Sequence, residues 1–288
     1  MDHTAAAQLF YAPVGGREAN DSNNKTREKV IVGLINGTLT DPAYDALKVA
    51  LYAWLDAKRA ELGLPPDAPA SAVGRGGRKY NWDFDLTLGP VTLKVEFKYG
   101  AESVASLPEF FNPAANKNFH NGESYARFFY RSYLVRVCEL YGVPLTMTED
   151  DYVARVHGTS KKPALFSALY EAERLGSPEQ KTLKKGIADD SIEAWLRLVK
   201  DKTDLATITA AFQTSQGGKH FLLCRGGAFF SDRIEPEELI VNSVIGVRLD
   251  KYLLLQSARP GTGFAMLLRW KNHAGILYPA WQISMWRD

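Results

Sequence analysis

Asp83, Glu96 and Lys98 have the side-chain types that hold a divalent cation and activate a water molecule. Two carboxylates held close together repel each other and raise the pKa of one of them, unless a divalent ion lies between them. Mg²⁺ is typically bound by one or two carboxylates and keeps several waters. Beside a phosphate group the ion lowers the pKa of the attacking water, and a nearby lysine can orient that water or neutralise developing charge. These residue types therefore predict a Mg²⁺ or Mn²⁺ site that hydrolyses phosphate esters.

Two strands joined by a short turn are expected to carry these residues. In the segment NWDFDLTLGPVTLKVEFKYG, residues 81–100, apolar and polar residues alternate over 82–88 and again over 91–97. This period of two predicts strands that each have one apolar face. Gly89-Pro90 lies between them, and a glycine at the first central position fits a two-residue type II′ turn.

The length of the turn decides which charged side chains face each other. A two-residue turn places Asp83 opposite Glu96 and Asp85 opposite Lys94, all on one face, with Lys98 one step further along it. A turn of three or five residues would put Asp83 and Glu96 on opposite faces. An exposed hairpin face held only by cross-strand salt bridges is the open alternative.

Asp83, followed thirteen residues later by Glu96-Phe97-Lys98, resembles the signature of the PD-(D/E)xK nuclease superfamily. That superfamily includes many restriction endonucleases, Holliday-junction resolvases and phage exonucleases. The resemblance covers residues 24–142 as a pattern, and only the motif residues are specific. It implies a core of helix, three strands, helix and strand, with the aspartate on the second strand and the ExK triplet on the third. Trp82 stands where the signature has proline.

The resemblance also implies a role for each motif residue. Asp83 and Glu96 would bind the metal, Lys98 would position the attacking water, and the backbone carbonyl of Phe97 would complete the metal's ligand shell.

Two further acids are candidate metal ligands. Asp85 is the second choice for the role of Asp83, because an acidic residue two positions from the ligand is common in the superfamily. Glu28 lies in a predicted first helix at residues 25–36, which in many members contributes a glutamate. Alternatively, Glu28 is an ordinary acid in the first helical turn, where the helix dipole favours it.

The composition is that of a globular protein, with 288 residues, 45% hydrophobic and 24% charged. A net charge of +2 permits a nucleic-acid partner without arguing for one. Cys138 and Cys224 both lie in apolar runs, which indicates buried, reduced thiols. Residues 1–16 lack the pattern of a signal peptide, and no apolar run reaches the roughly 20 residues that span a bilayer. We expect an intracellular protein, in the cytoplasm or nucleus, without a membrane partner.

The expected fold is α+β with an α/β core, namely a restriction-endonuclease-like mixed central sheet flanked by helices, with an appended C-terminal antiparallel β subdomain. A nuclease core with a helical insertion is expected over residues 1–225, and a β-rich subdomain over 226–288. Helices are predicted at 25–36, from Asp41-Pro42 to Gly63, at 124–142 over the sheet, and through most of 143–204, with a loop at 65–79. Strands are predicted on both sides of Arg225-Gly226-Gly227, the first closing the core sheet, and then as a meander at 251–258, 263–270 and 274–285.

Basic residues on loops and turns are candidates for contact with a phosphate backbone. The candidates are Arg75, Arg78, Lys79, Lys117, Lys161, Lys162, Arg269 and Lys271. His120 lies near Lys117, and the segment QKTLKK at 180–185 adds a second basic cluster. Solvated surface charge is the simpler interpretation of each of them.

The sequence therefore predicts a Mg²⁺- or Mn²⁺-dependent endonuclease of the restriction type, with DNA as its partner and a homodimer as a plausible assembly. The alternatives are a non-catalytic nucleic-acid-binding protein on the same fold, and a structure-specific or RNA-cutting nuclease.

Overall fold

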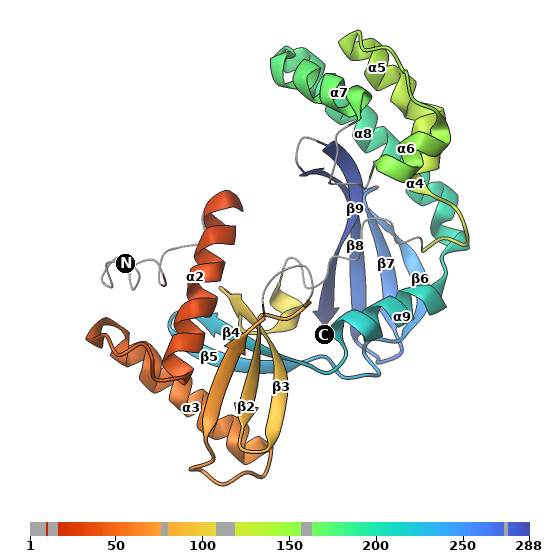
Figure 1. Ribbon diagram of the computed structural model, residues 1–288. Helices are drawn as coiled ribbons and strands as arrows, with labels where there is room; N and C mark the ends of the chain where they lie inside the picture. The colour runs from red at the N-terminus through yellow and green to blue at the C-terminus, as the bar shows by residue number, and fades with distance from the viewer. Residues whose placement is uncertain (1–9, 11–16, 76–79, 108–118, 157–162, 274–275) are drawn as a thin grey trace. The chain divides into compact units, whose positions relative to one another are not determined.

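The computed structural model describes residues 10, 17–75, 80–107, 119–156, 163–273 and 276–288, and its chain forms two compact units (Figure 1). The first unit comprises residues 1–107 and 215–235, and the second comprises 108–214 and 236–288. Each unit has its own sheet and its own helices, so the expected α+β class is confirmed. Within the described residues, every helix is too short or too polar to cross a membrane.

The first unit contains a mixed five-stranded sheet in the order β1-β2-β3-β4-β5. Neighbouring strands are antiparallel except β3 and β4, which are parallel. The strands are β1 (Ala70–Gly74), β2 (Phe84–Leu88), β3 (Val91–Tyr99), β4 (Lys219–Arg225) and β5 (Ala228–Arg233). A parallel pair needs a long crossover connection, and here that connection runs through the second unit. The strand predicted to close the core sheet is β4, and its hairpin with β5 is confirmed.

The hairpin of β2 and β3 has the predicted register. Leu88 pairs with Val91, and Asp85 pairs with Lys94. Gly89 has a φ of 52°, as the first central position of a type II′ turn requires. The two-residue turn, on which the pairing of Asp83 with Glu96 depended, is therefore confirmed.

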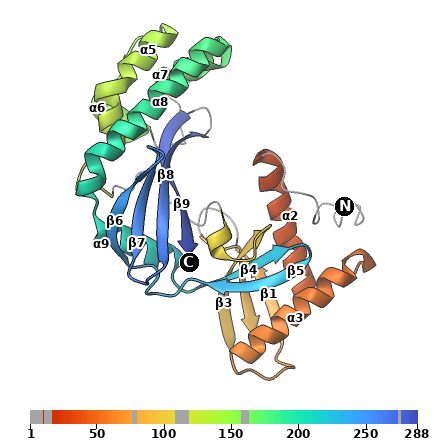
Figure 2. The same cartoon turned by 180° about the vertical axis from the view of Figure 1, so that it is seen from behind.

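Two helices, α2 (Arg17–Ile35) and α3 (Asp45–Glu61), lie on the same side of the first sheet (Figures 1 and 2). Their fully buried side chains form one core with those of the strands, including Ile31, Leu51, Leu55, Phe84, Leu86 and Val95. The predicted start of the second helix is confirmed, because the Asp41 side chain caps the 3₁₀ turn Pro42–Tyr44 that leads into α3. The first helix begins at Arg17 rather than at residue 25, since the Asn-rich segment at 20–24 has a lower helix propensity than alanine but is tolerated in a helix.

Strand β1 lies inside the segment that we predicted to be a loop, residues 65–79. Its residues are small, and Ala72 is its one buried side chain, so no alternation of large apolar residues marks it. The side chain of Asn36 satisfies the outer edge of this strand. Its amide donates to the carbonyl of Ala72 and accepts from the N–H of Ala72, both at 2.8 Å. An amide that imitates a neighbouring strand protects the sheet edge.

The second unit combines helices with a four-stranded antiparallel sheet in the order β6-β7-β8-β9. The strands are β6 (Val241–Arg248), β7 (Tyr252–Ser257), β8 (Thr262–His273) and β9 (Ile276–Arg287). The meander predicted for the C-terminal region is confirmed as β7 to β9, and β6 adds a fourth strand. The described helices are α4 (Tyr125–Phe129), a π-helical turn (Tyr130–Leu134), α5 (Val135–Tyr141), α6 (Glu149–Arg155), α7 (Ala164–Leu175), α8 (Pro178–Val199) and α9 (Leu205–Gln216).

The helix predicted at residues 124–142 forms, as α4, the π-helical turn and α5, but it belongs to the second unit and not to the unit of the first sheet. It packs against α8, where Tyr125 hydrogen-bonds to Ser191. The ring centres of Tyr125 and Trp195 are 5.7 Å apart. A capping box formed by Ser177 and Gln180 begins α8.

The expected domain boundary at residue 225 differs from the observed division. That boundary would separate β4 from β5, which hydrogen-bond to each other in the first sheet. The helical segment expected to be an insertion in the core instead groups with the C-terminal sheet. On α9, Phe212 packs against Phe264 of β8 at a ring distance of 4.6 Å, so a helix encoded before β4 covers the sheet encoded after it.

Candidate active site

Asp83 is tied to β3 on both sides of Glu96. Its backbone N–H donates to the carbonyl of Val95 at 3.0 Å, and its carboxylate oxygen Oδ2 accepts from the N–H of Phe97 at 2.8 Å. Burial raises the pKa of Asp83, Lys98 opposes that rise, and Glu96 adds to it. Asp83 and Glu96 are therefore electrostatic neighbours, as the predicted register requires.

Glu96 is only 8% exposed, and each of its two oxygens meets a different lysine. Oε1 lies 2.6 Å from Nζ of Lys98, and Oε2 accepts a hydrogen bond from Nζ of Lys219. Burial opposes the ionisation of Glu96, but Lys98 and Lys219 outweigh it and hold the pKa of Glu96 below its ordinary value. Glu96 is therefore a carboxylate at neutral pH.

Lys98 is held in its protonated form. Burial alone would lower the pKa of Lys98, but Glu96 and Asp83 outweigh it and raise that pKa above its ordinary value. The side chain is 32% exposed, whereas that of Lys219 is 4% exposed. At neutral pH Lys98 can donate hydrogen bonds and supply positive charge, and it cannot act as a base.

Lys219 is a residue of this site that the sequence did not reveal. It begins β4, where it pairs with Lys94 across the parallel ladder, and its side chain is 4% exposed. Burial lowers the pKa of Lys219, and the contact with Glu96 opposes this. The one feature of the sequence that could have indicated Lys219 is its position at the start of the segment KHFLLC, whose last four residues are apolar.

Glu28 belongs to the same electrostatic group. Burial raises the pKa of Glu28 to about 7, with Asp83 as the next cause and Glu96 a smaller one. Glu28 and Asp83 also line one open groove of about 660 Å³. The other lining residues come from α2, from the turn after it and from β1, and are Lys25, Lys29, Val32, Gly33, Thr38 and Gly74.

Both carboxylate oxygens of Asp85 accept hydrogen bonds from other side chains, and these contacts do not support the role of Asp85 as the second-choice metal ligand. Its Oδ2 accepts from Nε of Arg75 and its Oδ1 accepts from Nε1 of Trp82, each at 2.7 Å. Lys94, its partner across the ladder, instead places its ammonium 4.9 Å from the ring centre of Trp82. Arg75, a candidate for phosphate contact, is therefore committed to an ion pair, although its side chain remains 36% exposed.

The other candidates for nucleic-acid contact fall into two groups. Arg78, Lys79, Lys117, Lys161 and Lys162 lie outside the described residues, and of Lys271 only the backbone is described, in β8. Arg269 lines a groove of about 560 Å³ in the second unit. The same groove contains Lys181, Lys184 and Lys185 of the QKTLKK segment, together with Lys251 and Tyr252.

His120 is not available to a phosphate. It is 2% exposed, and its ring lies 5.7 Å from those of both Trp195 and Trp281. Burial lowers the pKa of His120 to about 4, so the imidazole is neutral at physiological pH. Cys138 and Cys224 are buried free thiols, as expected.

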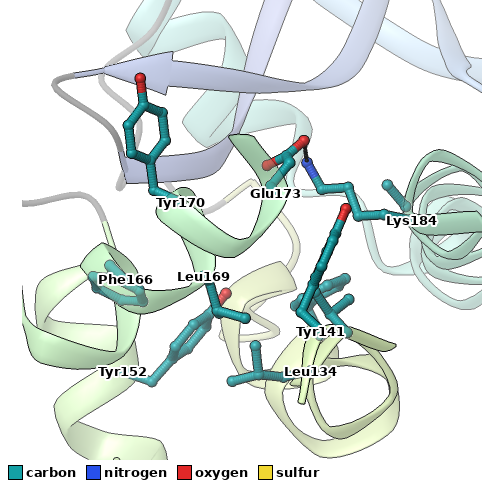
Figure 3. Close-up of a pocket in the computed structure, with 11 residues that line it drawn as sticks. Leu134, Tyr141, Tyr152, Phe166, Leu169, Tyr170, Glu173 and Lys184 are labelled. Carbon is teal, nitrogen blue, oxygen red and sulfur yellow. Dashed lines mark hydrogen bonds and ion pairs between the residues drawn. The ribbon is translucent and has the colours of Figure 1, made fainter. Parts of the chain in front are cut away.

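A small apolar cavity of about 40 Å³ lies among the helices of the second unit, at the π-helical turn (Figure 3). Leu134, Tyr152, Phe166 and Leu169 line it, and an ion pair of 2.7 Å between Lys184 and Glu173 lies at its margin. Its lining is almost entirely apolar and holds no group of acids that could bind a cation.

The site is not assembled as a ready metal cluster. Among the residues that the structure describes, no group of three or more His, Cys, Asp and Glu side chains is arranged to hold a metal ion. Both oxygens of Glu96 face ammonium groups instead. The chain matches no protein-family model, no curated protein and no solved structure.

Proposed function

We propose that this chain is a Mg²⁺- or Mn²⁺-dependent endonuclease of the restriction type that hydrolyses phosphodiester bonds in DNA. The observation that carries the proposal is the grouping of Asp83, Glu96 and Lys98 with Glu28. Glu28 on α2 is distant in the sequence from the three residues of the β2–β3 hairpin, yet each of the four side chains shifts the pKa of at least one of the others.

The order of elements supports the same proposal. Helix α2 is followed by a second helix, α3, by the three antiparallel strands β1 to β3, by the helices of the second unit and then by β4. Apart from the additional α3 and the several helices in place of one, this is the order of helix, three strands, helix and strand that the resemblance to the PD-(D/E)xK superfamily implies. Asp83 directly precedes the second strand, and Glu96 and Lys98 lie on the third.

The charges of the site fit a divalent cation. Three carboxylates, Glu28, Asp83 and Glu96, face two ammonium groups, so one negative charge is left over when all five groups are ionised. The pKa of about 7 for Glu28 is the expected response of a buried carboxylate that lacks full compensation by a cation. Asp83 and Glu96 would hold the ion, with Glu28 and the carbonyl of Phe97 as further ligands. When bound, Mg²⁺ supplies the charge that acidifies a water molecule and stabilises the phosphoryl transition state.

Lys98 is the one partly exposed cation that contacts Glu96 among the described residues. Since it stays protonated, it would donate to the attacking water or to a phosphate oxygen, and so hold the reacting atoms in place. A pre-positioned ammonium group is effective here because Glu96 beside it is buried, and charges interact more strongly where water is excluded.

The basic groove of the second unit supports a polyanionic partner. Its lining includes Lys181, Lys184, Lys185, Lys251 and Arg269, against two acids, Glu173 and Asp189. Five cations and two anions leave a local charge of +3, and such a surface binds a phosphate backbone without reading its sequence. A homodimer would supply two sites for the two strands of a duplex.

One observation favours an alternative, a non-catalytic nucleic-acid-binding protein on the same fold. The ammonium groups on both oxygens of Glu96 could replace the metal permanently. Within the enzymatic proposal, a structure-specific or RNA-cutting activity is the alternative substrate class, and branched DNA and RNA substrates tested beside plasmid DNA distinguish it.

Plasmid cleavage with Mg²⁺ or Mn²⁺ tests the proposal. Asp83→Ala, Glu96→Ala and Lys98→Ala should each lower the cleavage rate by about 100-fold or more, as removal of charge-stabilising groups does. Asp85→Asn is the matched control on the same hairpin and should keep activity within about 10-fold of the wild type. Metal-dependent cleavage that survives all three alanine substitutions would overturn the assignment.

A further inference from the structure

Lys219 is a fixed part of the site rather than a mobile one. It is the first residue of β4, so its backbone is held by the parallel ladder with β3. Its side chain is 4% exposed, and its ammonium group donates to Oε2 of Glu96. A buried ammonium group is stable only while it stays paired. Lys219 therefore cannot leave Glu96 without a large cost.

Lys98 differs from Lys219 in this respect. It contacts the other oxygen of Glu96, Oε1, at 2.6 Å, and its side chain is 32% exposed. A partly exposed lysine side chain can turn its ammonium group towards water once another cation takes its place beside the carboxylate. An incoming cation would therefore displace Lys98 from Oε1 and leave Lys219 on Oε2.

Two-metal sites place their ions about 3.5–4 Å apart and clamp both the attacking and the leaving oxygen. A carboxylate shared by two such ions must offer one oxygen to each. In this protein the second oxygen of Glu96 already faces a buried positive charge.

We propose that Lys219 is a positioning residue that occupies Oε2 of Glu96 and restricts the site to a single divalent cation, bound through Oε1 and Asp83. The inference rests on the proposed metal-dependent function and makes it more specific. The Lys219 ammonium group supplies one fixed positive charge on the side of Glu96 where a second ion would otherwise bind.

The test counts Mn²⁺ ions bound to the full chain by electron paramagnetic resonance, which follows the free ion during a titration. The wild type should bind one Mn²⁺. Lys219→Met removes the charge but keeps much of the length of the side chain, and it should raise the number to two. Lys219→Arg keeps the charge and should restore the value of one, which a merely structural role for Lys219 would not require.

The spectrum of the wild-type complex gives a second readout if Lys219→Met fails to fold. A single ion gives an isolated Mn²⁺ signal, whereas two neighbouring ions give a spin-coupled one. Two bound ions in the wild type, or a single ion in a folded Lys219→Met variant, would overturn this inference and leave the proposed function intact. A wild type that binds no Mn²⁺ at millimolar concentration would instead overturn the proposed function itself.

Discussion

Five ionisable side chains of the first unit, from α2, the residue before β2, β3 and β4, share one electrostatic neighbourhood. They are Glu28, Asp83, Glu96, Lys98 and Lys219. The two lysines keep Glu96 ionised, while at Glu28 burial outweighs the attraction of Lys98 and raises the pKa to about 7. Burial raises the pKa of Asp83, and Lys98 and the N–H of Phe97 partly oppose that rise. The uncompensated charge of the metal-free site is thus concentrated on Glu28 and Asp83.

Glu28 should make the metal-free protein less stable as the pH rises. The ordinary pKa of its carboxyl group is 4.5, and the value in the folded protein is about 7. Between these values the unfolded chain has lost the proton that the folded protein still binds, so stability falls with rising pH and levels off above pH 7. The melting temperature of Glu28→Gln should therefore depend less steeply on pH than that of the wild type, measured in EDTA from about pH 4.5 to 7.5. Parallel curves for the two proteins would contradict the raised pKa.

Asp83, Glu96 and Lys98 could be singled out from the sequence because they belong to one hairpin with a two-residue turn, where alternation fixes the facing pairs. Lys219 could not be identified in this way. It reaches Glu96 from a strand 123 residues further along the chain, and no local pattern indicates that β4 lies beside β3. Asp85 has the same local pattern as Asp83, and only the contacts with Arg75 and Trp82 separate the two.

At the scale of the elements, the turn between β2 and β3 sets the register of the candidate site. Gly89 has a φ of 52°, in a region that costs a side-chain-bearing residue roughly 1–2 kcal/mol. Gly89→Ala should therefore lower the free energy of unfolding of the first unit by about that amount, measured by denaturant titration. Gly74→Ala is the matched control, because Gly74 lies in β1 of the same sheet with no positive φ and with open space where a Cβ would lie. Its effect should be within about 0.5 kcal/mol of zero, and an equal loss in both variants would contradict the role of the turn.

The sequence predicted long, strongly periodic elements well and short or unusual ones poorly. The amphipathic α3 and the alternating β2 and β3 are recognisable because their apolar faces are regular. Strand β1 was missed because Asn36 and β2, rather than its own side chains, hold it in place.

At the scale of the whole molecule, the chain carries a net charge of only +2, so nucleic-acid binding must depend on where the charges gather. The groove of the second unit gathers five cations in one place among the described residues. Replacing Lys181 and Lys185 by glutamate should weaken binding to duplex DNA, measured in EDTA. The slope of log Kd against the logarithm of the salt concentration should also become smaller by about 1.8, because two lysines would no longer neutralise phosphates.

The matched control for this experiment is the double variant Arg136→Glu and Lys202→Glu, which makes the same change in net charge outside the groove of the same unit. It should leave the salt dependence close to that of the wild type. Equal decreases of affinity in the two double variants would show that overall charge, and not the groove, governs binding.

The division into units is the property that the sequence predicted least well. The linear order suggested a core followed by an appendage, whereas the polypeptide leaves the first sheet after β3 and returns to it for β4 and β5. Packing between α9 and β8, encoded on either side of β4 and β5, decides that arrangement, and no local periodicity reports it.

A crystal structure determined with Mn²⁺ tests the central claim most directly, because anomalous scattering locates the ion without reference to activity. We predict one anomalous peak in coordinating contact with Asp83 and Oε1 of Glu96, with Lys98 moved away and Lys219 still on Oε2. No peak at these carboxylates under saturating Mn²⁺, with both lysines still bound to Glu96, would contradict the claim that this site binds a catalytic metal.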